Sequence, residues 1–254
     1  MKISVITICH NSEKHLEHTI KSVLSQTHED IEYIIVDGNS TDTTTNIIRS
    51  FGSGISKWIS EPDNGLYDAL NKGLAMATGD VVGFLHSDDF FADSEVLSKV
   101  AVLFEKTDVH SVYGDIQYVD QADIGKPLTN RRYGKYRLWK FRLGWAPPHP
   151  TFYVKREVYD EYSGFDTSFD IAADYDCILR FLVKHKITVA YIPEVMVRMR
   201  VGGVSNRTMK NVRKKWREDY RAMQKNGFGN LLTLFFKTMR PVAHFYKSPK
   251  YLFE

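Results

Sequence analysis

The sequence predicts an α/β fold with a mixed, Rossmann-like central sheet flanked by helices. Short β-branched segments alternate with amphipathic helical segments over about the first 100 residues, which is the order of βαβ units and a mostly parallel sheet. From about residue 111 the order becomes mixed, and residues 206–247 read as two basic amphipathic helices. We therefore expect one compact domain over residues 1–205 and a helical appendage over residues 206–254.

The first half contains four segments with the character of short buried strands, at residues 3–8, 31–36, 57–60 and 81–85. The first is followed by polar residues, and Asn11 or Ser12 would cap the helix that comes next. A second helix would open at Thr41-Asp42. A third fits residues 66–77, with one apolar side formed by Leu66, Ala69, Leu70, Gly73 and Leu74.

The second half is expected to add strands at residues 111–119, near 151–154 and at 188–192. A helix fits residues 171–184, because its apolar residues recur at helical spacing. The segments therefore predict a sheet that is parallel in its first part and mixed in its second.

The composition is that of an ordinary globular protein. Of the 254 residues 43% are hydrophobic and 26% are charged, which argues against disorder and coiled coil. No apolar stretch approaches the roughly 18 residues that span a membrane, and no leader segment is evident. Cys9 and Cys177 lie far apart without ligand spacing, so we expect buried thiols. These features predict a reducing, cytoplasmic compartment.

The net charge of +3 conceals two regions of opposite sign. Residues 198–254 hold 14 Lys and Arg against 3 Asp and Glu, whereas residues 1–197 hold 20 against 28. An acidic body suits a metal site, and a basic tail suits an anionic surface. The acidic body argues against a nucleic-acid-binding protein.

Polar residues end three of the predicted strands: Thr7 to Asn11, Asp37, and Asp88-Asp89. In open α/β sheets ligands bind beyond the carboxyl ends of the strands, so these endings should converge on one edge. Asp37 alone would equally suit an ordinary turn. Adjacent carboxylates repel unless something compensates them, and their hard oxygens suit Mn²⁺ or Mg²⁺. The alternative for Asp88-Asp89 is a solvated loop in which Asp89 or Asp93 caps the next helix.

Several ordered motifs resemble family 2 glycosyltransferases of the GT-A fold. They are Ser4-Val5-Ile6-Thr7 with Asn11, Ser22-Val23-Leu24-Ser25-Gln26-Thr27, and Ile35-Val36-Asp37-Gly38-Asn39-Ser40-Thr41-Asp42. The segment Ser60-Glu61-Pro62-Asp63-Asn64-Gly65-Leu66-Tyr67-Asp68-Ala69-Leu70-Asn71-Lys72-Gly73 is similar to the branch that builds bacterial exopolysaccharide and O-antigen units, such as the colanic-acid enzymes. The resemblance is strong over residues 1–95, patchy to about 205 and weak beyond.

The resemblance implies a donor site for a nucleotide-diphosphate sugar, by default a UDP-sugar. Thr7 and Asp37 would line the pocket for base and ribose, and Asn11 belongs to the same strand end. Asp68 and Lys72 match the helix that faces the donor, where Lys72 would offset diphosphate charge.

The metal motif of the family is present in altered form. Asp88 matches the metal-contacting carboxylate of Asp-x-Asp, and Asp89 is the adjacent candidate ligand for Mn²⁺ or Mg²⁺. His86 stands where the first Asp of that motif is expected, which would weaken or retune metal binding. Leu70 replaces an Arg that many relatives carry, which leaves the phosphates to Lys72 or to later basic segments.

The segment Gly164-Phe165-Asp166 followed by Ile171-Ala172-Ala173-Asp174-Tyr175-Asp176 resembles the part of the family that carries the catalytic base, and Asp174 is the matching position. On a helix Asp174 lies at the border of the apolar stripe, from which a carboxylate can project into a cleft. Asp176 on the other flank is the rival base, and Asp170 is a plausible helix cap. One base with direct displacement implies inversion at the anomeric carbon.

Two further segments resemble parts of the family near the substrates. His149, in the segment Trp145-Ala146-Pro147-Pro148-His149-Pro150-Thr151, would contact the acceptor or phosphate, unless it is structural. Arg200 belongs to the glycine-rich segment 198–205 and would clamp phosphate; a plain connector is the alternative.

Basic residues are mixed with apolar ones in two places. Residues 131–142 hold six basic residues among aromatic ones, a pattern that fits single-stranded nucleic acid or anionic lipid. The apolar run 231–236 lies near Lys237 and Arg240, with Lys247 and Lys250 beyond, and favours an interfacial membrane helix over one simply packed on the body.

The sequence therefore predicts an inverting, metal-dependent glycosyltransferase that acts on a lipid-linked or glycan acceptor for bacterial surface polysaccharide, peripherally on the inner face of the cell membrane. A sugar nucleotidyltransferase is one alternative, although the Gly-rich phosphate loop that such enzymes place after the first strand is absent from His10-Asn11-Ser12. A non-catalytic nucleotide-sugar or membrane-binding protein is the other.

Overall fold

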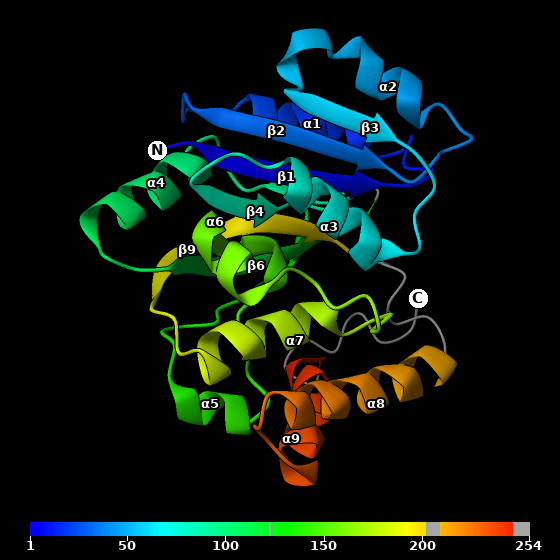
Figure 1. Cartoon of the computed structure of the whole chain (residues 1–254). Coiled ribbons are helices and arrows are strands. Elements are labelled where there is room, and N and C mark those ends of the chain that lie inside the picture. The colour runs from blue at the N-terminus through cyan, green and yellow to red at the C-terminus, as the bar shows by residue number, and fades with distance from the viewer. Residues whose placement is uncertain (122, 202–208, 246–254) are drawn as a thin grey trace.

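The computed structural model describes residues 1–121, 123–201 and 209–245, which form a nine-stranded mixed sheet with helices on both faces (Figure 1). The strand order is β3–β2–β1–β4–β8–β6–β9–β5, and β7 pairs with β6. The strands are β1 (Ile3–Cys9), β2 (Ile31–Asp37), β3 (Lys57–Ser60), β4 (Val81–Phe84), β5 (Phe90–Phe91), β6 (Ser111–Val119), β7 (Pro127–Arg131), β8 (Tyr153–Lys155) and β9 (Val189–Arg200). The helices are α1 (Leu16–Leu24), α2 (Thr44–Ser50), α3 (Leu66–Met76), α4 (Val96–Lys106), α5 (Leu138–Arg142), α6 (Arg156–Tyr162), α7 (Ala173–Leu179), α8 (Met209–Lys225) and α9 (Leu231–Phe245).

The first half of the sheet is parallel, as the βαβ pattern predicts. β1 pairs in parallel with both β2 and β4, and β2 pairs in parallel with β3. β8 is antiparallel to both β4 and β6, while β6 and β9 are parallel. The short β8 therefore separates a parallel half from a mixed half, which confirms the predicted change of order.

Successive side chains of the strands point to opposite faces of the sheet and contribute to two apolar layers. On β1, Ile3 and Val5 pack with α1, α2 and α4, whereas Ile6 and Ile8 pack on the opposite face with α3, α6 and α7. Both layers consist mainly of buried aliphatic and aromatic residues, so the sheet is covered on both faces. Cys9 and Cys177 are buried free thiols, as expected.

Several local expectations were wrong. β9 continues through Pro193 to Arg200, with irregular register against β6, although the sequence predicted an end at Ile192. α1 begins after His15, so neither Asn11 nor Ser12 caps it. On α3 the predicted inward residues Ala69, Leu70 and Gly73 are buried, but Leu66 is exposed and Tyr67 is buried in its place.

The predicted helix at 171–184 is α7 followed by one π-helical turn at Arg180–Lys184. Asp170 does not cap this helix, because the N-cap residue is Ala172. No side chain makes a capping hydrogen bond at its N-terminus. Missed by the sequence pattern were the short strands β5 and β7 and the helices α5 and α6. The helix expected after Asp93 is α4, but its N-cap is Glu95 rather than Asp89 or Asp93.

The C-terminal helices α8 and α9 pack on the body rather than extending away from it. They lie beyond α5 and α7, at the bottom of Figure 1. Ala222 and Met223 of α8 are fully buried in the same apolar layer as α7. α9 approaches the end of α5 so closely that a Cβ on Gly144 would overlap the backbone of Lys237. Gly144 also has a positive φ of 72°, which glycine adopts at little cost.

Gly144 should therefore be the contact on which α9 docking depends. Gly144→Ala combines left-handed backbone strain with a clash against α9, and we expect it to lower the free energy of unfolding by about 3 kcal/mol. Gly227→Ala is the matched control, because Gly227 has a similar φ of 63° and nothing lies near its Cβ position. This control should lower the free energy of unfolding, measured by urea denaturation, by only about 1 kcal/mol. Equal losses in the two variants would show that the close approach of α9 does not matter.

Candidate active site

The carboxyl ends of β1, β2, β3 and β4 lie along one edge of the sheet. Cys9 is in register with Asp37, and Asp37 with Ser60. The loop that holds His86 to Asp89 follows β4, which is parallel to β1. This confirms the expectation that the polar strand ends converge on one edge, where open α/β sheets bind ligands.

Asp37 and Asn11 hold the loops at this edge together. The fully buried carboxylate of Asp37 accepts hydrogen bonds from the backbone N–H and hydroxyl of Ser40 and from the Ser60 hydroxyl, at 2.6 Å for Ser60. The backbone N–H of Asn11 donates to the Ser40 hydroxyl at 2.7 Å, and its side-chain oxygen accepts from the backbone of Thr41 at 2.9 Å. In this structure the two residues predicted to bind nucleoside therefore also fix the loop after β2.

Thr7 lies deeper than predicted. Its side chain is fully buried, and its hydroxyl accepts a hydrogen bond from Tyr33 at 3.2 Å. The hydroxyl is therefore not at the sheet edge in this structure. Cys9, two positions later on the same face of β1, reaches the edge and contacts Asp37 through its thiol at 3.6 Å.

The two predicted α3 residues contact the loop after β3. Asp68 accepts a hydrogen bond from the backbone of Asn64 at 3.0 Å, as a residue in the first turn of a helix commonly does. The Lys72 ammonium lies 2.8 Å from Glu61 and 2.7 Å from the carbonyl of Pro62. The hydrogen bond to Glu61 raises the pKa of Lys72, so the ammonium is fully charged beside this loop. Leu70, which lies between Asp68 and Lys72 in the sequence, is buried in the core.

The two adjacent acidic residues have different environments. Asp88 is partly exposed, whereas Asp89 is buried, and burial beside Asp88 raises the pKa of the Asp89 carboxyl well above its usual range. Burial disfavours the charged form of Asp89, whereas the more exposed Asp88 can meet a cation at the surface, so Asp88 is the better of the two predicted ligands. Arg200 donates to the backbone carbonyl of Asp88 and contacts His18 at 3.1 Å, which ties β9 to this loop.

The donor set fits a cation that shares its ligands with a substrate. Within the described ranges, no three His, Cys, Asp or Glu side chains are grouped so as to hold a metal ion by themselves. Mg²⁺ and Mn²⁺ commonly take one or two protein carboxylates and complete their shell with phosphate oxygens and water. Asp88 supplies such a carboxylate at the sheet edge.

Asp174, in the first turn of α7, is brought next to two other elements. The Tyr67 hydroxyl of α3 donates to one of its oxygens at 3.3 Å. Burial would raise the pKa of Asp174, but the positive charges of Lys215 and Lys237, together with a hydrogen bond from the backbone of Tyr175, outweigh it and lower the pKa below its usual value. The carboxylate is therefore ionised at neutral pH while remaining partly enclosed.

His149 packs beside this carboxylate. Its ring stacks on Phe84 with the centroids 5.4 Å apart, and its centroid lies 6.0 Å from that of His86. Burial lowers the pKa of His149 to about 4, so the ring is neutral at pH 7. A neutral imidazole donates a hydrogen bond from one ring nitrogen and accepts one at the other.

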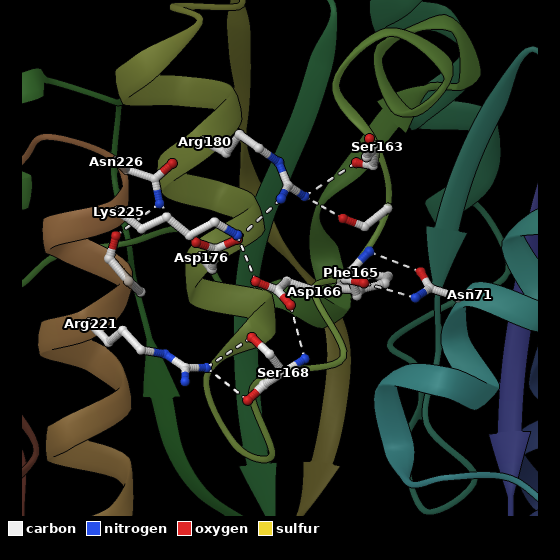
Figure 2. A network of polar contacts seen from close by, with 12 residues as sticks. Asn71, Ser163, Phe165, Asp166, Ser168, Asp176, Arg180, Arg221, Lys225 and Asn226 are labelled. Atoms are coloured by element: carbon white, nitrogen blue, oxygen red, sulfur yellow. Dashed lines mark hydrogen bonds and ion pairs between the residues drawn. The ribbon is translucent and has the colours of Figure 1, made fainter.

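Asp176, the rival to Asp174, is enclosed in an ionic network (Figure 2). Its fully buried carboxylate accepts from Arg180 at 3.1 Å and from the Asn226 amide at 2.9 Å, and the Lys225 ammonium lies 3.6 Å away. Protein groups therefore already satisfy the hydrogen-bonding capacity of this carboxylate. The geometry therefore favours Asp174 over Asp176 as a group that meets a substrate.

Sequence reasoning missed Tyr67 and the lysines of the C-terminal helices. Tyr67 lies in the segment that carries the family resemblance, but the apolar side predicted for this helix did not include it. Lys215 of α8 and Lys237 of α9 share the buried carboxylate of Asp219, at 3.6 and 2.7 Å. No local pattern signals that these charges face Asp174, which precedes them by some 40 to 60 positions.

Comparisons with known proteins agree on the class. The model of Glycosyl transferase family 2 matches residues 4–163. An uncharacterized glycosyltransferase of Mycobacterium tuberculosis is 35% identical over 193 residues, which cover 74% of this chain and 71% of that protein. Among solved structures, Staphylococcus aureus TarS 1–349 in complex with UDP has a TM-score of 0.67 at 17% identity, covering 88% of this chain and 65% of that one.

A mannosyltransferase from Pyrobaculum calidifontis, in complex with GDP-Man and Mn²⁺, has a TM-score of 0.66 at 18% identity, covering 98% of this chain and 72% of that one. The fold is that of the GT-A glycosyltransferases. The chain belongs to glycosyl transferase family 2. The match covers β1 to α6, whereas α7 with Asp174 and the helices α8 and α9 follow it.

Proposed function

We propose that this protein transfers a sugar from a nucleotide-diphosphate donor to an acceptor hydroxyl with inversion at the anomeric carbon. The observation that carries the proposal is the ionised, partly enclosed carboxylate of Asp174 on α7, with Tyr67 bound to one oxygen. Membership in glycosyl transferase family 2 supports a transferase over a sugar nucleotidyltransferase. A UDP-sugar is the default donor, and TarS in complex with UDP supports that choice.

In this proposal Asp174 is the general base. Its carboxylate takes the proton of the acceptor hydroxyl as that oxygen attacks the anomeric carbon from the side opposite the leaving group. Tyr67 fixes the orientation of the carboxylate through its hydrogen bond. The lysines that lower the pKa of Asp174 keep it unprotonated before the reaction. A single base with direct displacement gives inversion, so an α-linked donor sugar would become β-linked.

The donor would lie along the edge formed by β1, β2 and β4. Asn11, Asp37 and the loop they hold would flank the nucleoside. Asp88 would hold Mn²⁺ or Mg²⁺, which offsets the negative charge on the departing diphosphate. Lys72 and Arg200 are the predicted cations for that diphosphate, and each would first exchange its present protein partner. The glycine-rich segment after Arg200 lies outside the described residues.

The base assignment is tested by Asp174→Asn. The amide keeps the shape but cannot accept the proton, so kcat should fall by about 10²- to 10⁴-fold while nucleotide binding changes by less than about twofold. Transfer is measured with radiolabelled donors, and the anomeric configuration of the product by NMR. Asp176→Asn serves as the comparison, because it should mainly destabilise the network around Arg180. If Asp176→Asn abolishes transfer and Asp174→Asn does not, the base has been assigned to the wrong residue.

A non-catalytic nucleotide-sugar-binding protein is the second candidate. The burial of Asp89 and the internal pairing of Lys72 and Arg200 favour it, because they leave fewer free groups for a metal ion and a diphosphate. Undiminished nucleotide binding without transfer or donor hydrolysis, with every acceptor tried, would support this candidate over the enzyme.

We further propose that residues 1–205 form the GT-A domain and that residues 206–254 form an appendage on the acceptor side. The acceptor would be lipid-linked or a glycan, and the protein would sit peripherally on the inner face of the cell membrane. Across the ranges that the structure covers, no helix combines the length and apolarity that a membrane crossing requires. A membrane contact would therefore be made by a surface.

The outer face of α9 offers such a surface. Leu231 and Phe235 are 68% and 55% exposed, with Leu232 and Met239 on the same side of the helix, whereas Lys237 faces inward to Asp219. A helix with its apolar side chains outward and its lysine inward is the reverse of an ordinary surface helix. α5 packs against α9 and adds Trp139, 59% exposed, between basic residues of segment 131–142. Apolar side chains beside cations favour an anionic lipid surface.

The double variant Leu231→Ser/Phe235→Ser tests this surface. Each change removes roughly 1.5 kcal/mol of binding free energy that comes from burying an apolar side chain in the lipid. Affinity for anionic vesicles should therefore fall at least about tenfold. Leu66→Ser on α3 is the control, because Leu66 is also exposed but belongs to another helix. Binding is measured by co-sedimentation with phosphatidylglycerol-containing vesicles. Equal recovery of the unaltered protein in the supernatant with and without these vesicles would rule out the membrane contact.

A further inference from the structure

No side chain caps α7, and a residue of α8 instead binds the backbone that comes directly before the helix. The N-cap residue Ala172 carries only a methyl group, so its side chain cannot accept a hydrogen bond from the helix that it opens. The carboxylate of Glu218 accepts from the backbone N–H groups of Asp170 at 3.1 Å, Ile171 at 2.8 Å and Ala172 at 3.1 Å. The Glu218 side chain is buried, with 8% of its surface exposed.

Glu218 belongs to a polar face of α8 that contacts the segment between α6 and α7. Lys214, Glu218, Arg221 and Lys225 recur at helical spacing and bind residues 166–172. Arg221 donates to the backbone of Ser168 at 2.8 Å, and its guanidinium lies 3.8 Å from the ring centroid of Phe169. Figure 2 shows Arg221 and Lys225 extending from α8 toward this segment. One face of α8 thus binds residues 166–172, which lead into α7.

We propose that Glu218 is a positioning residue for the base Asp174. The inference rests on the proposed function, in which Asp174 takes the acceptor proton. Asp174 follows the last of the three held amides by two positions, so the bonds to Glu218 fix both the place and the rotation of the first turn of α7. That turn keeps the carboxylate against Tyr67 of α3.

Such positioning matters because a general base acts only within hydrogen-bond reach of its proton, at about 2.6–3.2 Å. A displacement of about 1 Å from productive geometry can cost about 10²-fold in rate. Hydrogen bonds to a charged acceptor are also stronger than neutral ones. A single carboxylate that binds three consecutive amides is therefore a stiff connection between α8 and the base.

The alternative is that Glu218 only docks α8 and contributes stability. The two roles differ in what a variant changes. A docking residue affects the free energy of unfolding, whereas a positioning residue affects kcat in the folded protein and leaves KM nearly unchanged.

The test compares Glu218→Gln with Arg221→Met in the full chain. Gln keeps the size of Glu but turns one acceptor oxygen into an N–H donor facing the backbone amides. We expect kcat to fall about tenfold, the KM of donor and acceptor to stay within twofold, and amide hydrogen exchange to accelerate at residues 170–174. Arg221→Met removes another contact of the same helix face and keeps a long side chain, so its kcat should stay within twofold.

A normal kcat for Glu218→Gln would overturn the positioning role and leave the base assignment intact. A parallel loss of kcat in Arg221→Met would also overturn it, because the whole docking face would then be responsible. If Glu218→Gln does not fold, Glu218→Asp gives the same comparison, because it keeps the charge but withdraws it by one methylene. An unaltered protein that transfers no sugar would instead overturn the proposed function together with this inference.

Discussion

The parallel pairing of β1 with β2 and β4 is the constraint on which the rest of the site depends. It places the loops after three strands on one edge, and a shift of register would move each buried side chain to the opposite face. The buried carboxylate of Asp37 then joins two of these loops through Ser40 and Ser60. A carboxylate held by several donors in a buried place is costly to disturb, so the edge is rigid before a ligand arrives.

The reversal at β8 brings a second group of residues to the same edge. Because β8 runs antiparallel to β4, the turn before it carries His149 onto the ring of Phe84, next to α7. The C-terminal helices then close the site from outside. Lys215 and Lys237 share Asp219 and lower the pKa of Asp174, while Glu218 holds the backbone that precedes it. Residues outside the family match thus set both the charge and the position of the proposed base.

The sequence was sufficient for the elements that local patterns encode. The strands β1 to β4 and β6 lie within one residue of their predicted bounds, because short β-branched runs between polar turns are distinctive. Local patterns could not reveal the extension of β9 through Pro193, which pairing with β6 decides. The family resemblance implied that Thr7 lines the pocket, whereas in the structure its hydroxyl accepts from Tyr33 inside the core. The contacts of Glu218 span 46 to 48 positions, so only the fold reveals them.

The central claim is that the edge beyond β1, β2 and β4 binds a nucleotide diphosphate together with a divalent cation held by Asp88. Calorimetric titration with UDP, GDP and dTDP, each with and without Mn²⁺, tests it most directly. The account predicts that one of the three nucleotides binds and that Mn²⁺ tightens its binding. Binding without any effect of Mn²⁺ would contradict the role of Asp88, and no binding of any nucleotide under either condition would contradict the claim itself.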